Sequence, residues 1–255
     1  MKITISDATT QYQKIGSGYP LVLLHGWGCD WQIWSPIITS LSEQYQLLIP
    51  DLPLFGESDT NNQVWDSFQY AAWLEAFINQ VIPGQPHVLA GHSFGGKIGA
   101  VYAAEYKPSL LTGLIIIDAS GLPEKLSTKE KVTQTIADLI PGPVKKMVGK
   151  KIKEKVLSGM NVATDYQQAS DIQQAVLKKI VRENISKQLS QIELDTLVIW
   201  GKKDETTPLE KGALFAELIE NGKLIVFEES GHYPFIDETP KFIETVQTYI
   251  SEIKK

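Results

Sequence analysis

The segment Gly91-His92-Ser93-Phe94-Gly95 has the spacing G-x-S-x-G, which is typical of a sharp turn from a strand into a helix. The flanking residues fit that turn, because 87–90 is a short apolar run and 97–104 has small and apolar residues at helical spacing. Glycine is needed on both sides of the serine, where a Cβ would collide with the neighbouring strand or helix. Ser93 would then present its hydroxyl beside the free N–H groups of a helix start. The alternative interpretation is a glycine-rich turn with an incidental serine.

A serine hydroxyl is a weak nucleophile at neutral pH and needs a base within hydrogen-bonding reach. The chain has four histidines, so few residues can supply that base. His87 begins a strand, His92 flanks the serine and His25 opens a glycine-rich loop, and we expect these three to be structural. His232 remains, in a loop after the expected strand 223–227, and is therefore the candidate base.

The base in turn needs an acid that fixes its tautomer and stabilises its charged form. Asp204 directly follows the apolar strand 196–200 and is the favoured candidate. Glu205 is its neighbour, and Asp118 follows an earlier strand and would have to reach the histidine from there. Asp195 lies at the wrong end of its strand. The resulting order of serine, acid and histidine is one of the known orders of such triads.

Acyl transfer passes through a tetrahedral intermediate whose negative oxygen must be held by N–H groups. The N–H of Phe94 directly follows the serine. We expect the second N–H from the loop His25-Gly26-Trp27-Gly28, where Trp27 is the candidate and its ring can also form a wall of the pocket. The candidate pocket residues are Trp27, Phe94, Tyr233 and Met147.

These residues lie in a regular alternation of expected strands and helices. The expected strands are 2–5, 10–15, 20–24, 46–50, 87–90, 114–118, 196–200 and 223–227, and the expected helices are 31–41, 67–81, 97–104, 208–219 and 240–253. Such alternation predicts a parallel sheet with helices on both faces, and ligands bind beyond the carboxyl ends of its strands. Residues 121–190 contain helical segments but no strand-like run. We expect them to form a helical cap, or lid, inserted into a core domain of residues 1–120 and 191–255.

Size and composition are those of an ordinary globular protein. The chain has 255 residues and a net charge of −6, so we expect no nucleic-acid partner. Cys29 is the single cysteine, which excludes a disulfide within the chain. The first residues lack the apolar segment and cleavage site of a signal peptide, and no apolar stretch is long enough to cross a bilayer. We therefore expect a cytoplasmic protein without a transmembrane segment.

Taken together, the motifs resemble those of the α/β-hydrolase superfamily over nearly the whole chain. The matching segments are His25-Gly26-Trp27-Gly28, residues 51–58, residues 91–96, Gly201 with Asp204 and Pro208, and Gly231-His232. The resemblance implies an eight-stranded, mostly parallel sheet with helices on both faces, a helical cap between the sixth and seventh strands, and a triad of Ser93, Asp204 and His232. Leu54 is a departure, since relatives often have glycine there, and it bears on the conformation of the loop 51–58.

The nucleophile narrows the chemistry, because one such fold hosts many reactions. Serine argues against the haloalkane dehalogenase and epoxide hydrolase types, which resemble this chain elsewhere but use aspartate at this position. Acyl transfer to water remains, with carboxylic esters of small to medium acyl chains as the favoured substrates and lactones or thioesters as others. No metal-ligand cluster and no phosphate-binding glycine loop is apparent, so we expect no metal and no cofactor.

Two further functions stay open. The Gly-Trp-Gly loop resembles esterases of the pimeloyl-carrier-protein methyl ester type, which implies an acidic carrier protein as a partner. Lys and Arg outnumber Asp and Glu by 13 to 7 in residues 121–190, and six lysines crowd one stretch: Lys145, Lys146, Lys150, Lys151, Lys153 and Lys155. These lysines can instead form a solvated outer face of helices over the pocket, or a membrane-binding face. A non-catalytic ligand receptor on the same fold is the alternative of another class.

Overall fold

The computed structural model describes residues 1–5, 8–60, 63–123 and 169–254. The chain divides into two compact units, residues 1–122 with 170–255 and residues 123–169. Most of the expected cap lies outside the described residues, so its boundaries at 121 and 190 stay a prediction. Within the described part of the chain, no helix is both long and apolar enough to cross a membrane.

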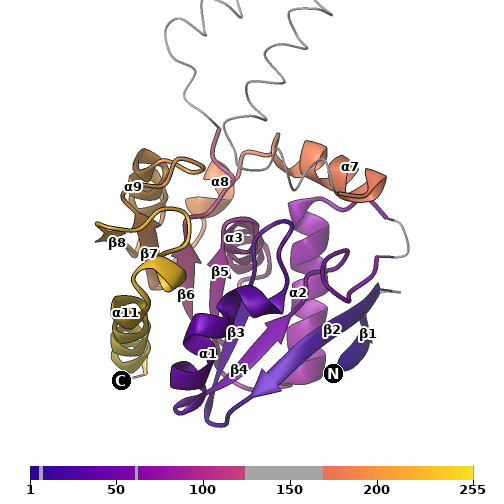
Figure 1. Cartoon of the computed structure of the whole chain (residues 1–255), viewed down its shortest axis with the longest axis horizontal. Coiled ribbons are helices and arrows are strands. Elements are labelled where there is room, and N and C mark those ends of the chain that lie inside the picture. The colour runs from indigo at the N-terminus through magenta and orange to yellow at the C-terminus, as the bar shows by residue number, and fades with distance from the viewer. Residues whose placement is uncertain (6–7, 61–62, 124–168, 255) are drawn as a thin grey trace, which may run out of the picture. The chain divides into compact units, whose positions relative to one another are not determined.

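Eight strands form one sheet in the order β1-β2-β4-β3-β5-β6-β7-β8 (Figure 1). β1 pairs antiparallel with β2 and β2 with β4, whereas all later neighbours are parallel. The mostly parallel sheet that the sequence predicts is therefore confirmed. The strands are β1 Lys2–Ile5, β2 Ala8–Ile15, β3 Tyr19–Leu24, β4 Tyr45–Pro50, β5 His87–His92, β6 Leu111–Ile117, β7 Thr196–Gly201 and β8 Gly222–Phe227.

Helices cover both faces of this sheet. On one face α1 and α11 contact each other and the strands β4 and β6, and on the other face α3 packs on β3, β5 and β6 while α9 packs on β7 and β8 (Figure 1). The helices are α1 Ser35–Ser42, α2 Ser67–Val81, α3 Phe94–Tyr106, α7 Asp171–Ile180, α8 Ser186–Leu189, α9 Leu209–Leu218, α10 Pro234–Asp237 and α11 Thr239–Ile253, and the 3₁₀ helix η1 covers Trp31–Trp34.

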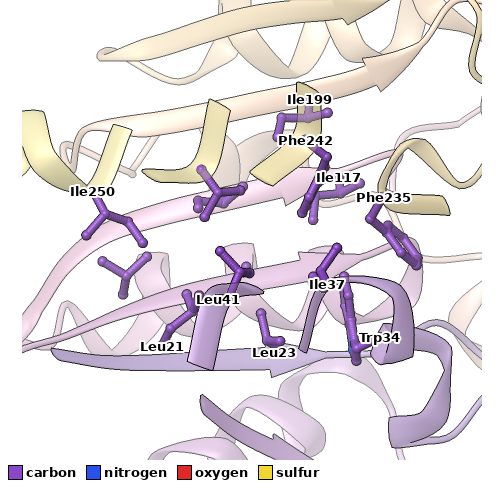
Figure 2. Packing of buried hydrophobic residues seen from close by; sticks show 14 of the residues in the cluster. Leu21, Leu23, Trp34, Ile37, Leu41, Ile117, Ile199, Phe235, Phe242 and Ile250 are labelled. Carbon is purple, nitrogen blue, oxygen red and sulfur yellow. The ribbon is translucent and has the colours of Figure 1, made fainter. Parts of the chain in front are cut away.

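The central strands are buried on both faces, as their continuous apolar sequences predict. Leu21 and Leu23 of β3 belong to the cluster under α1 and α11, with Leu41 and Phe242 among its members (Figure 2). On the other face, a Cβ built at Gly99 of α3 would lie 3.2 Å from Leu89 of β5. Val88 and Ala90 of β5 belong to the cluster under α1 and α11, so successive residues of this strand pack into different layers.

The strand register determines which loops meet at the carboxyl edge. β3 and β5 pair in parallel with Leu24 opposite Gly91, so the loop after β3 lies beside the turn after β5. β6 and β7 pair with Ile117 opposite Ile199, and β7 and β8 pair with Gly201 opposite Phe227. The loops that follow β3, β5, β6, β7 and β8 therefore all begin at the same edge of the sheet, as the sequence predicts.

Candidate active site

Ser93 lies on the turn between β5 and α3 in a conformation that few non-glycine residues adopt. Its φ is 52° and its ψ is −110°, outside the usual regions for an L-residue. A Cβ at Gly91 would lie 2.4 Å from the Gly95 carbonyl oxygen, and one at Gly95 would lie 2.3 Å from the Leu24 carbonyl oxygen. The steric need for both glycines is therefore confirmed, and the turn is built as the G-x-S-x-G spacing predicts.

Asp204 and His232 form the central contact of the site. His232 Nδ1 lies 2.7 Å from Asp204 Oδ2, although the two residues come from different loops, after β7 and β8. The carboxylate also accepts hydrogen bonds from Thr206 N at 2.7 Å, Thr207 N at 2.9 Å and Thr207 Oγ1 at 2.7 Å. Burial by itself raises the pKa of Asp204, but the hydrogen bond and charge of His232 and the Thr207 bonds together lower the pKa to about 2. These contacts favour the ionised form of Asp204, as expected of the acid that would orient the imidazole.

His92 joins the His232 loop to the serine turn. Its Nε2 donates to the His232 carbonyl oxygen at 2.7 Å, and the two imidazole rings lie 4.7 Å apart between centroids. His92 is buried and directly precedes Ser93. Among the described residues, no hydrogen bond joins the Ser93 hydroxyl to the His232 ring, so that contact stays a prediction. Catalytic hydrogen bonds often tighten only when substrate is bound.

The loop after β3 packs directly on the serine turn. A Cβ at Gly26 would lie 3.1 Å from His92 Nδ1 and 3.3 Å from Ser93 Cβ, so only glycine allows this approach without a shift. The next residue is Trp27, one candidate donor of an oxyanion N–H. The other candidate, the N–H of Phe94, belongs to the first turn of α3, where N–H groups have no partner within the helix. Phe94 thus directly follows Ser93 in the chain, whereas Trp27 follows the glycine that packs against Ser93.

His25 shapes that loop, as the sequence predicts. Its Nδ1 lies 2.8 Å from the Gly26 carbonyl oxygen, and its Nε2 accepts the Leu52 N–H at 2.8 Å. The ring is fully buried, and burial lowers the pKa of His25 to about 4. The histidine is therefore a neutral link between the loop after β3 and the loop after β4.

The loop after β4 contains a leucine in a backbone conformation that favours glycine. Leu54 has a φ of 82°, in the left-handed region that favours glycine. Its carbonyl oxygen accepts a hydrogen bond from Gln173 Nε2 of α7 at 3.1 Å. Asp51 holds the same loop, because its carboxylate accepts the N–H groups of Trp31 at 2.8 Å and Glu57 at 3.0 Å. The loop keeps the turn that glycine would favour, at the expense of a strained leucine.

The candidate pocket residues differ in their exposure. The Phe94 ring is buried and meets Tyr70 edge-on at 5.1 Å. Tyr233 is partly exposed and lies 5.0 Å from the His92 ring, and the Trp27 ring meets Phe55 at 5.9 Å. Met147 lies outside the described residues, as do the six lysines at positions 145–155. Contact of any of these residues with a substrate stays a prediction.

One group of described side chains has the composition of a metal-ligand set. One nitrogen of His232 and one carboxylate oxygen each of Asp118 and Asp204 lie within 4.8 Å of one another. Two of these three side chains, His232 and Asp204, are already hydrogen-bonded to each other.

A hollow of about 290 Å³ lies at the opposite end of α3 from Ser93. It is lined by Ala103 and Lys107, among others, and lies away from the candidate active site.

Sequence reasoning missed two contributors to this geometry. Thr207 binds Asp204 through both its N–H and its hydroxyl, and the D-x-T-T turn in the sequence could have indicated it, because aspartate often accepts N–H groups two and three residues ahead. The short helix α10 follows His232, and its Asp237 accepts the Gly231 N–H at 2.9 Å. No signal of helical periodicity fits four residues.

The chain is similar to known proteins in sequence and in fold. Residues 21–245 match the family described as "Alpha/beta hydrolase family". The chain is 30% identical over 244 residues to a pimeloyl-[acyl-carrier protein] methyl ester esterase of Legionella pneumophila (strain Corby), with 93% of this chain and 97% of that protein covered. A protein of the same name from Aeromonas hydrophila is 25% identical over 253 residues, with 93% and 98% covered. The solved structure of an esterase from Exiguobacterium antarcticum has a TM-score of 0.75 at 27% identity and covers 100% of this chain and 99% of that one.

Proposed function

The chain belongs to the alpha/beta hydrolase family, and we propose that it is a serine carboxylesterase with Ser93, Asp204 and His232 as its catalytic triad. Its similarity to esterases supports ester hydrolysis as the reaction. The observation that carries the triad is the 2.7 Å contact between His232 and Asp204, in a loop that His92 ties to the serine turn. The preferred substrates are carboxylic esters of small to medium acyl chains, with lactones as further substrates.

In the proposed mechanism the imidazole of His232 takes the hydroxyl proton of Ser93 while Oγ attacks the ester carbonyl carbon. The N–H groups of Trp27 and Phe94 hold the negative oxygen of the tetrahedral intermediate. The ester C–O bond then breaks, the imidazolium returns its proton to the departing alkoxide, and an acyl-enzyme remains. Water, deprotonated by the same histidine, releases the acid and restores the serine. Asp204 stays ionised throughout and stabilises the imidazolium.

A panel of p-nitrophenyl esters with increasing acyl length, run beside several lactones, tests this proposal. We expect turnover of the shorter esters by the native chain and a loss of at least about 10³-fold in kcat for Ser93→Ala. Ser251→Ala is a matched control, because that exposed hydroxyl on α11 bonds only the Thr248 carbonyl oxygen in the described structure. Retained turnover in Ser93→Ala, with a normal unfolding curve, would refute the assignment.

A carrier-linked ester or thioester is the second candidate substrate. It is favoured by two relatives whose names specify a methyl ester on an acyl-carrier protein, at 30% and 25% identity. The lysines at 145–155 supply a basic stretch suited to an acidic carrier. Replacing Lys145, Lys146 and Lys150 together by glutamine is expected to raise KM for a carrier-linked ester and leave p-nitrophenyl butyrate hydrolysis unchanged. An equal effect on both substrates would contradict carrier recognition.

A further inference from the structure

A buried carboxyl group beside the triad has no part in the proposed mechanism. Asp118 directly follows β6 and is fully buried, with a φ of 42°. Its Oδ1 accepts the Gly201 N–H at 2.9 Å, but its Oδ2 has no hydrogen-bond partner among the described residues. A non-glycine residue in the left-handed region and an unpaired buried oxygen both cost free energy. Such a residue at the edge of an active site therefore requires an explanation.

The position of Asp118 gives that explanation. One of its carboxylate oxygens lies within 4.8 Å of both an oxygen of Asp204 and a ring nitrogen of His232. The Thr207 hydroxyl lies between the two aspartates. Its oxygen is 3.1 Å from the backbone carbonyl oxygen of Asp118 and 2.7 Å from Asp204 Oδ2. Two carboxyl groups this close in a buried site do not both ionise, because the second negative charge meets the first at low dielectric. One of the two acids keeps its proton.

The hydrogen bonds decide which acid is charged. Asp204 accepts four hydrogen bonds, from Thr206 N, Thr207 N, Thr207 Oγ1 and His232 Nδ1, and these favour its carboxylate form. The Asp118 carboxyl accepts one. Burial, followed by the charge of Asp204, raises the pKa of Asp118 well above its ordinary value. The negative charge thus lies on Asp204, and the proton lies on Asp118.

We propose, on the basis of the esterase function above, that Asp118 is a second acid of the site and acts as a positioning residue. It stays protonated while Asp204 is charged, so that the His232 ring faces a single carboxylate. Where residue 204 cannot be charged, as in Asp204→Asn, Asp118 loses its proton and becomes the charged partner of the imidazolium. The other titratable groups around it are Asp237 of α10, which adds a further negative charge, and His92, which contacts the His232 ring.

A double-variant cycle tests the proposal. Asn is a suitable replacement for Asp118, because asparagine tolerates a positive φ and its side-chain oxygen can still accept the Gly201 N–H. We expect Asp118→Asn to lower kcat/KM for p-nitrophenyl butyrate at least ten-fold more in the Asp204→Asn background than in the native background. The residual activity of Asp204→Asn is expected to rise more steeply with pH than that of the double variant, because only the single variant keeps at position 118 a carboxyl group that can lose its proton. A difference below ten-fold between the two backgrounds would overturn the proposal.

Asp195→Asn, the same change at the opposite end of β7, is the matched control. It is expected to change kcat/KM by the same factor in the native and Asp204→Asn backgrounds.

A spectroscopic measurement keeps the proposal testable if the double variant does not fold. In protein labelled with ¹³C at aspartate carboxyl groups, the Asp118 signal is identified by its loss in Asp118→Asn. We expect that signal to report a protonated acid at pH 7 in the native chain and a carboxylate in Asp204→Asn. A carboxylate in the native chain, or a protonated acid in both, would overturn the proposal. Absence of ester turnover in the native chain would instead refute the proposed function, so the two failures are distinguishable.

Discussion

Acid is expected to destabilise this protein through His25, a residue that takes no part in the proposed proton transfer. Its Nε2 accepts the Leu52 N–H at 2.8 Å, and its Nδ1 lies 2.8 Å from the Gly26 carbonyl oxygen. The ring is therefore neutral with its proton on Nδ1. A second proton on Nε2 would point at the Leu52 N–H and break the link between the two loops. Burial, partly offset by the bond to Gly26 and the charge of Asp30, lowers the pKa of His25 to about 4.

The sign and size of the effect follow from that shift. Between pH 6.5 and about 4 the unfolded chain binds a proton at His25 that the folded chain does not bind. The free energy of unfolding therefore falls as the pH drops through this window. Above pH 6.5 and below about pH 4, the contribution of His25 to that free energy no longer changes with pH. A pKa of about 4 in the folded chain against 6.5 in the unfolded chain corresponds to roughly 3 kcal/mol between pH 7 and pH 4.

Urea unfolding followed by tryptophan fluorescence at pH 7, 5.5 and 4 measures this contribution. The comparison variant is His25→Gln, which keeps an acceptor for the Leu52 N–H and cannot titrate. All other groups titrate in both chains, so the native chain is expected to lose roughly 3 kcal/mol more than His25→Gln between pH 7 and pH 4. If both chains lose stability equally, the assignment of the neutral His25 link is wrong. If His25→Gln does not fold, ¹⁵N NMR of the native His25 ring provides the test, with a neutral ring expected down to about pH 4.

Two further predictions concern buried polar groups next to the site. Lys97 is buried and donates to the Ile180 carbonyl oxygen at 2.6 Å and to Glu183 at 3.3 Å, so Lys97→Met is expected to lower the free energy of unfolding by about 3 kcal/mol, as for other broken buried pairs. Thermal unfolding of Lys97→Met, Glu183→Gln and the double variant checks this, and additive losses would contradict a coupled pair. His92 holds the His232 carbonyl oxygen at 2.7 Å, so His92→Leu is expected to lower kcat for p-nitrophenyl butyrate about ten-fold with little change in KM, the kinetic equivalent of about 1.4 kcal/mol. His92→Gln, which can still donate, is expected to recover most of that loss, and equal rates for both variants would show that the hydrogen bond has no kinetic role.

The fold was predictable because its main signals are local. Buried parallel strands are continuous apolar runs, so β3 and β7 lie within one residue of their expected positions. The helix α2 has its expected bounds, Ser67–Val81, because Asp66 and Gln69 form a capping box before a run with helical spacing. The expected helix 31–41 was wrong in its first turn, which is the 3₁₀ helix η1, with α1 beginning just before Pro36. Proline lacks an N–H and favours the first turn of a new helix.

The sequence supplies candidates for the site by residue type, but it does not predict their contacts. Ser93 is recognisable from the glycines around it, and Asp204 and His232 from their places after β7 and β8. The proximity of Asp118 to Asp204 depends on the pairing of β6 with β7, in which Ile117 lies opposite Ile199. No local pattern specifies such a register, which side-chain packing across the whole sheet determines.

Covalent labelling with a fluorophosphonate tests the central claim most directly, because only an activated serine reacts with it. Intact-protein mass spectrometry is expected to show one adduct per chain, and peptide mapping is expected to place it on Ser93. Ser93→Ala should acquire no adduct, and His232→Gln should react far more slowly. An unlabelled native chain would indicate a ligand receptor with an inactive site, and an adduct on any other residue would show that Ser93 is not the nucleophile.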